Sequence, residues 1–195
     1  MTETFVQIIL KLQKNKAKDF IREIYRDNLQ KYADALTTVI LVQTNRELEK
    51  IVCGYYIDET YVADNSDREK VYALIDLMCD TVRESGKKNE EKLFQKAISY
   101  IDNNLSDATL YVGKVAELVG VSSSAFAKMF ESRLGISPAE YIAGSRVKRS
   151  LGLLGESNVM IKNVAEQVGF SSAETYIRAF KKIYGTTPGK YKEKE

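Results

Sequence analysis

The side chains in this chain with the most obvious chemistry are cations, and the usual catalytic groups are scarce. The 195 residues contain no His and only two Cys, Cys53 and Cys79. His is the commonest general base and metal ligand, and two isolated Cys on apolar segments form no zinc pattern, so each is expected to be a buried free thiol. No Gly-rich phosphate loop is present either. We therefore expect no catalytic residue, no metal site, no cofactor and no enzyme activity.

Positive charge is concentrated in the second half of the chain. The formal net charge is only +2, but residues 107–195 hold 13 Lys and Arg against 9 Asp and Glu. Residues 1–106 hold 16 against 18. A surface that binds nucleic acid needs Lys and Arg to neutralise phosphates. If the chain binds nucleic acid, residues 107–195 are expected to do so.

The same half contains an internal repeat. Val115–Gly120 (VAELVG) recurs as Val164–Gly169 (VAEQVG), forty-nine positions later. The residues that follow the two copies match at a separation of fifty. The matched residues are Phe130, Gly135, Pro138 and Tyr141 in the first copy and Phe180, Gly185, Pro188 and Tyr191 in the second. A period of this length indicates a duplicated structural unit. The change from forty-nine to fifty places one extra residue in the second copy, between its Gly and its Phe.

Each copy has the pattern of two helices joined by a short turn. Gly120 and Gly169 stand where the first helix ends, because glycine accepts the left-handed conformation that such an ending often needs. Ser122 and Ser171 follow where an N-cap is expected, and Ser171 with Glu174 has the spacing of a capping box. This arrangement is typical of a helix-turn-helix motif, whose second helix enters the DNA major groove.

Residues from about 92 to 193 resemble the DNA-binding domain of the AraC/XylS family of bacterial transcription regulators. In the second copy the resemblance is carried by Ile161-x-x-Val164-Ala165-x-x-Val168-Gly169-Phe170, by Arg178-x-Phe180-Lys181-Lys182 and by Gly185-x-Thr187-Pro188-x-x-Tyr191. A linker helix of the family type begins at Ser137-Pro138-Ala139-Glu140, with Ser at the cap, Pro at the first helical position and Glu three residues after the cap. The resemblance implies an all-α protein with two helix-turn-helix subdomains joined by that helix. We place a DNA-binding domain at 89–195, its first motif at about 109–134, the linker helix at about 137–155 and its second motif at about 160–184.

The resemblance also implies which side chains face DNA. Base-facing positions fall on Ser123, Ser124, Ala127 and Lys128 in the first motif and on Ala173, Glu174, Ile177 and Arg178 in the second. Arg178 suits a bidentate contact with a guanine edge, whereas Glu174 is explained at least as well by its capping position. Phosphate contacts are expected from Lys114, Arg146, Lys148, Arg149, Lys162, Lys181 and Lys182.

The first motif departs from the family pattern. Glu131 stands where a Lys usually follows the first Phe, Tyr111 takes the place of an N-cap residue, and Gly113 lies in a first helical turn. Gly in a helix costs roughly 0.5–1 kcal/mol relative to Ala. We therefore predict that the second motif carries more of the sequence discrimination.

Residues 1–88 have a mainly helical pattern and are predicted to form an N-terminal regulatory or dimerisation region. Their apolar faces are equally explained by a self-contained core, and residues 39–42 fit a buried helix turn or a strand. The polar run at 85–89 is the best candidate for a linker. The region is similar to the helical segment that precedes the DNA-binding domain in family members of response-regulator or membrane-sensor type. The chain is therefore either a short regulator or the C-terminal piece of a longer one.

The sequence thus predicts a regulator that binds double-stranded promoter DNA, an activator by resemblance, with RNA polymerase as its partner in that case and a homodimer as a further hypothesis. The alternative is a helical protein-interaction adaptor that has lost specific DNA binding. A DNA affinity that falls steeply with salt separates the two. The chain opens without a basic region and has no apolar run of membrane-spanning length, so we expect a cytoplasmic protein and no membrane partner. The sequence does not indicate an effector.

Overall fold

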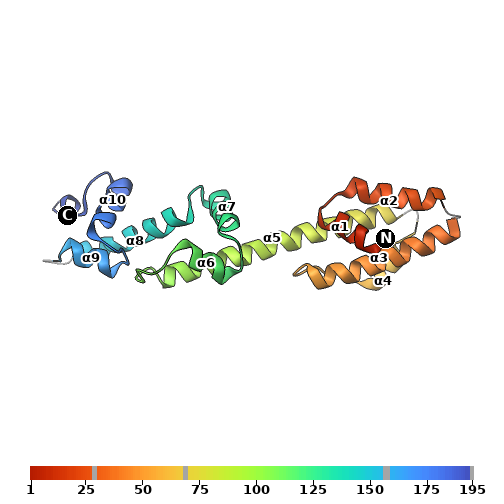
Figure 1. Cartoon of the computed structure of the whole chain (residues 1–195), viewed down its shortest axis with the longest axis horizontal. Helices are drawn as coiled ribbons and strands as arrows, with labels where there is room; N and C mark the ends of the chain where they lie inside the picture. The colour runs from red at the N-terminus through yellow and green to blue at the C-terminus, as the bar shows by residue number, and fades with distance from the viewer. Residues whose placement is uncertain (28–29, 68–69, 156–158, 194–195) are drawn as a thin grey trace. The chain divides into compact units, whose positions relative to one another are not determined.

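The computed structural model describes residues 1–27, 30–67, 70–155 and 159–193, and all regular structure within these ranges is α-helical (Figure 1). The all-α prediction is therefore confirmed. The chain divides into two compact units, residues 1–92 and residues 93–195.

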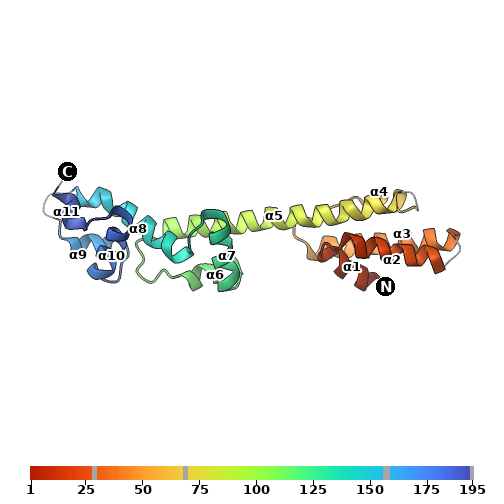
Figure 2. The same ribbon diagram turned by 90° about the horizontal axis from the view of Figure 1, so that it is seen from above.

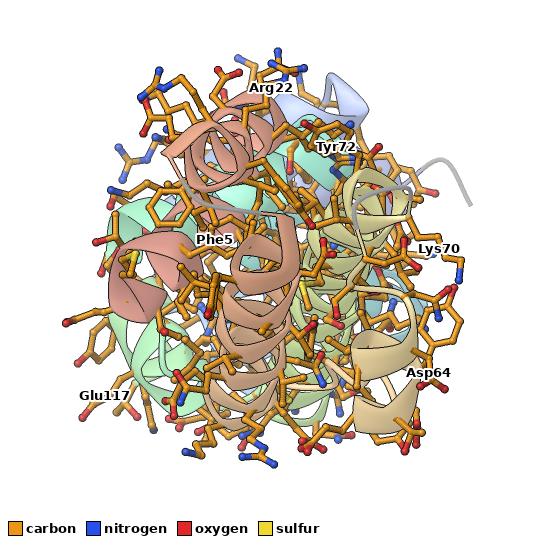
Figure 3. All side chains as sticks on the ribbon, turned by 90° about the vertical axis from the view of Figure 1, so that its right-hand side faces the viewer. Phe5, Arg22, Asp64, Lys70, Tyr72 and Glu117 are labelled. Atoms are coloured by element: carbon orange, nitrogen blue, oxygen red, sulfur yellow. The ribbon has the colours of Figure 1, made fainter. Side chains whose placement is uncertain are left out.

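The first unit is a helical bundle built around one apolar core. Its helices are α1 (Thr2–Leu10), α2 (Lys14–Asp27), α3 (Gln30–Ile51), α4 (Glu59–Asp64) and the first part of α5 (Val71–Asn103). Fully buried side chains such as Phe5, Ile21 and Ile75 bring α1, α2 and α5 together, and Figure 3 shows Phe5 pointing into the bundle. Residues 39–42, which fit either a helix or a strand, lie inside α3.

Charged contacts join α2 to α5 at the edge of this bundle. Lys14 Nζ lies 3.0 Å from Asp80 Oδ1, and Lys18 Nζ lies 2.8 Å from Asp76 Oδ2. The Arg22 guanidinium lies 5.6 Å from the centre of the Tyr72 ring; both residues are labelled in Figure 3. Because these pairs are partly exposed, the apolar core contributes most of the stability of the unit.

The linker expected at residues 85–89 is wrong, because this segment lies inside the continuous helix α5. Polar and charged residues occupy the exposed face of a helix as readily as they occupy a linker. Lys87 donates to Glu84 one helical turn away at 2.8 Å, and the Ser85 side chain is buried. The division between the two units falls after Lys92, within the helix. Cys79 is a buried free thiol as expected, but the expectation is wrong for Cys53, which is exposed in the turn after α3.

The second unit contains two similar helix pairs and a helix that packs on both (Figure 2). The first pair is α6 (Val112–Val119) and α7 (Ser123–Leu134); α8 (Pro138–Leu154) follows. The second pair is α9 (Ile161–Gln167) and α10 (Ala173–Tyr184), with α11 (Pro188–Lys192) after it. Helix α8 supplies Ile142 to the core of the first pair and Val147 and Leu154 to the core of the second. As expected, α8 starts with a capping box of Ser137 and Glu140 and with Pro at its first turn.

Candidate DNA-binding surface

Helices α7 and α10 are equivalent elements of the two repeats. Each has twelve residues, each is capped by a Ser hydroxyl, and each ends at a glycine in the left-handed conformation. Ser122 accepts from the backbone N–H of Ala125, and Ser172 accepts from that of Thr175, both at 3.2 Å. Because the two helices start fifty positions apart, each exposed residue of one has a direct counterpart in the other.

The capping residue predicted for α10 is wrong by one position. The turn glycines are followed by equivalent hydrogen bonds, from Val121 N to Ala116 O and from Phe170 N to Ala165 O. Up to Phe170 the repeats are therefore offset by forty-nine, and from Ser172 onward by fifty. The inserted residue is Ser171, which is exposed. Ser171 and Ser172 are adjacent, and either could cap the helix on sequence grounds. In the structure Ser172 is the cap.

The predicted base-facing residues of α7 lie on its outer side. Ser123, Ser124 and Lys128 are exposed and Ala127 is half-buried, whereas Phe126 and Phe130 point into the core. Lys128 presents a charge that reaches beyond the helix surface, while the Ser124 hydroxyl lies 3.2 Å from that of Ser122. The sequence-discriminating chemistry of this helix is therefore limited to Lys128 and small neighbours.

The equivalent face of α10 is chemically richer. Glu174 and Arg178 are exposed one turn apart, and Ala173 and Ile177 are half-buried beside them. The pKa of Glu174 is lowered by its own backbone N–H, by the hydroxyl of Ser172 and by the charge of Arg178. The carboxylate is thus already engaged at the start of the helix. Because Ser172 is the cap, Glu174 is the second residue of α10 and not the third, so the capping box predicted with Ser171 is not formed. Arg178 lies in the middle of the helix and is exposed.

Six of the seven predicted phosphate-binding cations fall into two groups. Lys148 and Arg149 on α8 and Lys181 on α10 are exposed. Three others form ion pairs with acidic residues of the same unit: Lys182 with Glu140 at 2.8 Å, Lys114 with Asp107 at 3.3 Å and Lys162 with Glu166 at 3.9 Å. The side chains of the paired cations are still 40–75% exposed. A phosphate would have to compete with a carboxylate at these positions, so the first group is better prepared for DNA.

The prediction that Arg146 binds phosphate is wrong. Its side chain is only 8% exposed, and its Nε donates to the carbonyl of Leu105 at 2.9 Å. Its Nη2 donates to the carbonyl of Asp107 at 2.8 Å. Burial lowers the pKa of the guanidinium. A signal was present in the sequence, because Arg146 lies four residues from both Ile142 and Ser150, on the buried stripe of α8.

Comparison with known proteins agrees with this geometry. A family model described as a helix-turn-helix domain matches residues 115–194. The multiple antibiotic resistance protein MarA of Salmonella typhimurium is 34% identical over 95 residues, which are 49% of this chain and 74% of that protein. The chain belongs to the AraC/XylS family of DNA-binding transcription regulators.

Two further similar proteins show how much of the chain is shared. The solved C-terminal domain of AraT, a response regulator from Geobacillus stearothermophilus, has a TM-score of 0.50 and 29% identity, and the match covers 53% of this chain and 85% of that one. The uncharacterized regulator YtdP of Bacillus subtilis is 26% identical over 121 residues, which are 62% of this chain and 16% of that protein. The chain therefore spans only a small part of the length of YtdP. Within the described ranges, no helix is both long and apolar enough to cross a membrane.

Proposed function

We propose that this AraC/XylS regulator binds a specific site in double-stranded promoter DNA by placing α7 and α10 in adjacent major-groove segments. The observation that carries the proposal is the equivalence of Lys128 and Arg178. Both are exposed cations at the same position of matched, identically capped helices within one unit. Recognition helices of this class contact base edges from their N-terminal half and middle. A site with two contact blocks about one helical turn apart follows from this arrangement.

The proposed contacts divide by chemistry. Arg178 pairs with a guanine edge, and Ile177 and Ala173 contact thymine methyl groups. Lys128 supplies the main contact of α7, supported by Ser123, Ser124 and Ala127. Lys148, Arg149 and Lys181 bind the phosphate backbone, and Lys114, Lys162 and Lys182 join them only by exchanging their carboxylate partners for phosphates. Because α10 carries Arg178, whose guanidinium suits a bidentate contact with a guanine edge, we assign most of the sequence discrimination to the second motif.

For the whole protein we propose an activator that contacts RNA polymerase, with residues 1–88 as a regulatory or dimerisation region and 89–195 as the DNA-binding domain. The likeness of the second unit to the C-terminal domain of a response regulator supports an upstream signalling element. Sedimentation of the chain over a range of concentrations tests dimerisation, and a monomer at high concentration contradicts it. Transcription with purified RNA polymerase on the selected site tests activation.

The experiment that tests DNA binding is selection of random duplex DNA by the purified chain, followed by salt titration on the enriched site. Enrichment of two contact blocks about one turn apart supports reading by both helices. Enrichment of one block restricts base reading to a single motif. Equal binding of all sequences, with little dependence on salt, contradicts the proposal and favours the adaptor function, because phosphate contacts always release counterions.

A further inference from the structure

Arg146 connects the two helix-turn-helix motifs through a single buried side chain. It lies on α8, and its two hydrogen bonds reach the carbonyls of Leu105 and Asp107 in the segment between α5 and α6. The centre of its guanidinium lies 5.8 Å from the centre of the Phe170 ring, which belongs to the turn of the second motif. A buried guanidinium is costly unless its donors are satisfied, and here two backbone carbonyls accept from it.

The turn of the second motif also packs directly on the same carbonyl. Gly169 has a φ of +91°, and a Cβ added to it would lie 2.1 Å from the Leu105 oxygen and 3.0 Å from Arg146 Nε. The equivalent glycine of the first motif, Gly120, has a φ of +74° but no atom within 4 Å of such a Cβ. Glycine is therefore required at Gly120 for its backbone conformation alone. At Gly169 it is required for a close approach between the motifs as well.

We propose that Arg146, Leu105 and Gly169 form a lock that fixes the position of the second motif relative to the first. The lock thereby sets the spacing that a DNA site must have between its two contact blocks. The effect on the spacing of the DNA site rests on the proposed function, whereas the lock itself does not. Arg146 is a positioning residue: it is buried, so it acts through the placement of α7 and α10 and not by touching DNA.

The apolar contacts of α8 do not by themselves fix one motif relative to the other. Ile142 packs with the first motif, and Val147 packs with the second. Each of these contacts holds one motif to α8. The Leu105 carbonyl differs from these contacts, because it lies in the segment just before the first motif. It accepts a hydrogen bond from Arg146 of α8 and packs against the backbone of Gly169 in the turn of the second motif. Loss of this contact would leave each motif folded while loosening one relative to the other.

The lock is tested first without DNA, by measuring the distance between two spin labels in the full chain. Glu117 and Glu166, exposed and equivalent positions of α6 and α9, are replaced by Cys and labelled, in a chain that also carries Cys53→Ser. Cys79 is fully buried and stays unlabelled. The chain with an intact lock is expected to give one narrow distance distribution. Gly169→Ala and Arg146→Gln are each expected to broaden or shift it.

Gly120→Ala is the matched control, because it imposes the same left-handed strain without the clash. It is expected to keep the narrow distribution. Distributions for Gly169→Ala and Arg146→Gln that match that of the control would overturn the lock. Thermal unfolding and circular dichroism confirm that each variant is folded, and two variants of independent chemistry keep the test decisive if one of them does not fold.

The second measurement uses the selected DNA site with the distance between its blocks changed by one base pair in either direction. The unaltered chain is expected to lose roughly tenfold in affinity for each step, and the two lock variants less than about threefold. An unchanged spacing dependence in both variants would contradict the role of the lock in site selection. If the unaltered chain selects no site at all, the proposed function fails, while the label distances still decide whether the lock exists.

Discussion

The hydroxyl of Tyr176 donates a hydrogen bond to the hydroxyl of Ser150 at 2.8 Å, and both side chains are completely buried. Ser150 in turn donates to the carbonyl of Val147 at 2.6 Å. This chain of hydrogen bonds attaches α10 to α8. A buried polar group without a partner lowers the stability of the folded protein. Removing the acceptor Ser150 is therefore expected to have a different effect on stability from removing the donor hydroxyl of Tyr176.

Ser150→Ala should therefore destabilise the protein more than Tyr176→Phe. The first change leaves the Tyr176 hydroxyl buried without an acceptor, at about 1–3 kcal/mol, whereas the second removes one hydrogen bond worth about 0.5–1.5 kcal/mol. Urea unfolding of the full chain measures both. Tyr184→Phe, on an exposed position of the same helix, is the control and should change little. The opposite order for the two buried variants would show that Tyr176 does not depend on Ser150.

The stability of the second unit should depend on pH through Glu140. Lys182 donates to its carboxylate at 2.8 Å, and the Ser137 backbone N–H donates at 3.1 Å. With the Ser137 hydroxyl, these contacts lower the pKa of Glu140 from 4.5 to about 2. The folded state thus favours the charged form. The resulting stabilisation is complete above about pH 4.5 and is lost as the pH falls toward 2.

Melting temperatures of the native chain and of Glu140→Gln, recorded between pH 7 and pH 2, check this dependence. The difference between them should be largest near neutral pH and shrink as the pH approaches 2. Glu117→Gln, at an exposed carboxylate of α6, is the control for the change of charge. A difference that stays constant over the whole range would mean that Glu140 is not held by Lys182.

Arg178→Ala should cost about 1–3 kcal/mol in binding to the selected site and relax the base preference at one position. Lys128→Ala should cost less and change the base preference less, because α7 offers only Lys128 with small neighbours. Affinities of both variants for the selected site and for single-base changes within it give the comparison. If Lys128→Ala abolished binding and specificity while Arg178→Ala left both intact, the ranking of the two motifs would be reversed.

Lys148→Ala should weaken binding by a similar factor on every DNA sequence. Its side chain is exposed on α8, so we expect a phosphate contact and a decrease of about 1 in the slope of log affinity against log salt. Lys50→Ala, in the first unit, removes the same charge outside the proposed DNA-binding domain and should leave the slope unchanged. A sequence-dependent loss for Lys148→Ala would instead indicate a base contact.

Gly86→Ala should stabilise the protein by roughly 0.5–1 kcal/mol, because Gly86 lies in the interior of α5 and an added Cβ meets no atom within 4 Å. Gly152→Ala, at an equally open position within α8, provides a comparison in a second helix. Thermal and urea unfolding measure both changes. A Gly86→Ala variant of unchanged or lower stability would support a linker at 85–89, as the polar sequence first suggested.

The repeat in the sequence predicted the second unit well because its signals are local. Glycines at turns, Ser137 at a cap and Pro138 at a first helical turn each impose a backbone conformation on their own neighbourhood. The positions of α7, α8 and α10 followed from these signals. The capping serine of α10 was misplaced by one residue because Ser171 and Ser172 satisfy the same local rule. The hydrogen bonds of Thr175 to Ser172 and of Phe170 to Ala165 separate them.

The roles of individual cations were harder to predict because they depend on residues distant in sequence. Arg146 is buried against carbonyls about forty residues earlier, and Lys182 pairs with Glu140 forty-two residues earlier. Nothing in the neighbourhood of either residue identifies these partners. In the first unit, the polar run at 85–89 is compatible with a helix or a linker. Helix α5 continues through it, although the buried apolar residues stop at Val82 and resume only at Phe94.

The continuity of α5 has a consequence for proteolysis. Proteases cleave chain that can adopt an extended conformation over several residues, and loops between compact units are their usual targets. Residues 85–89 are polar and mostly exposed, but their backbone is helical, and the boundary between the units lies inside the same helix. Limited digestion is therefore expected to spare this boundary despite its linker-like composition. Separating the two units in this way would first require α5 to unwind locally.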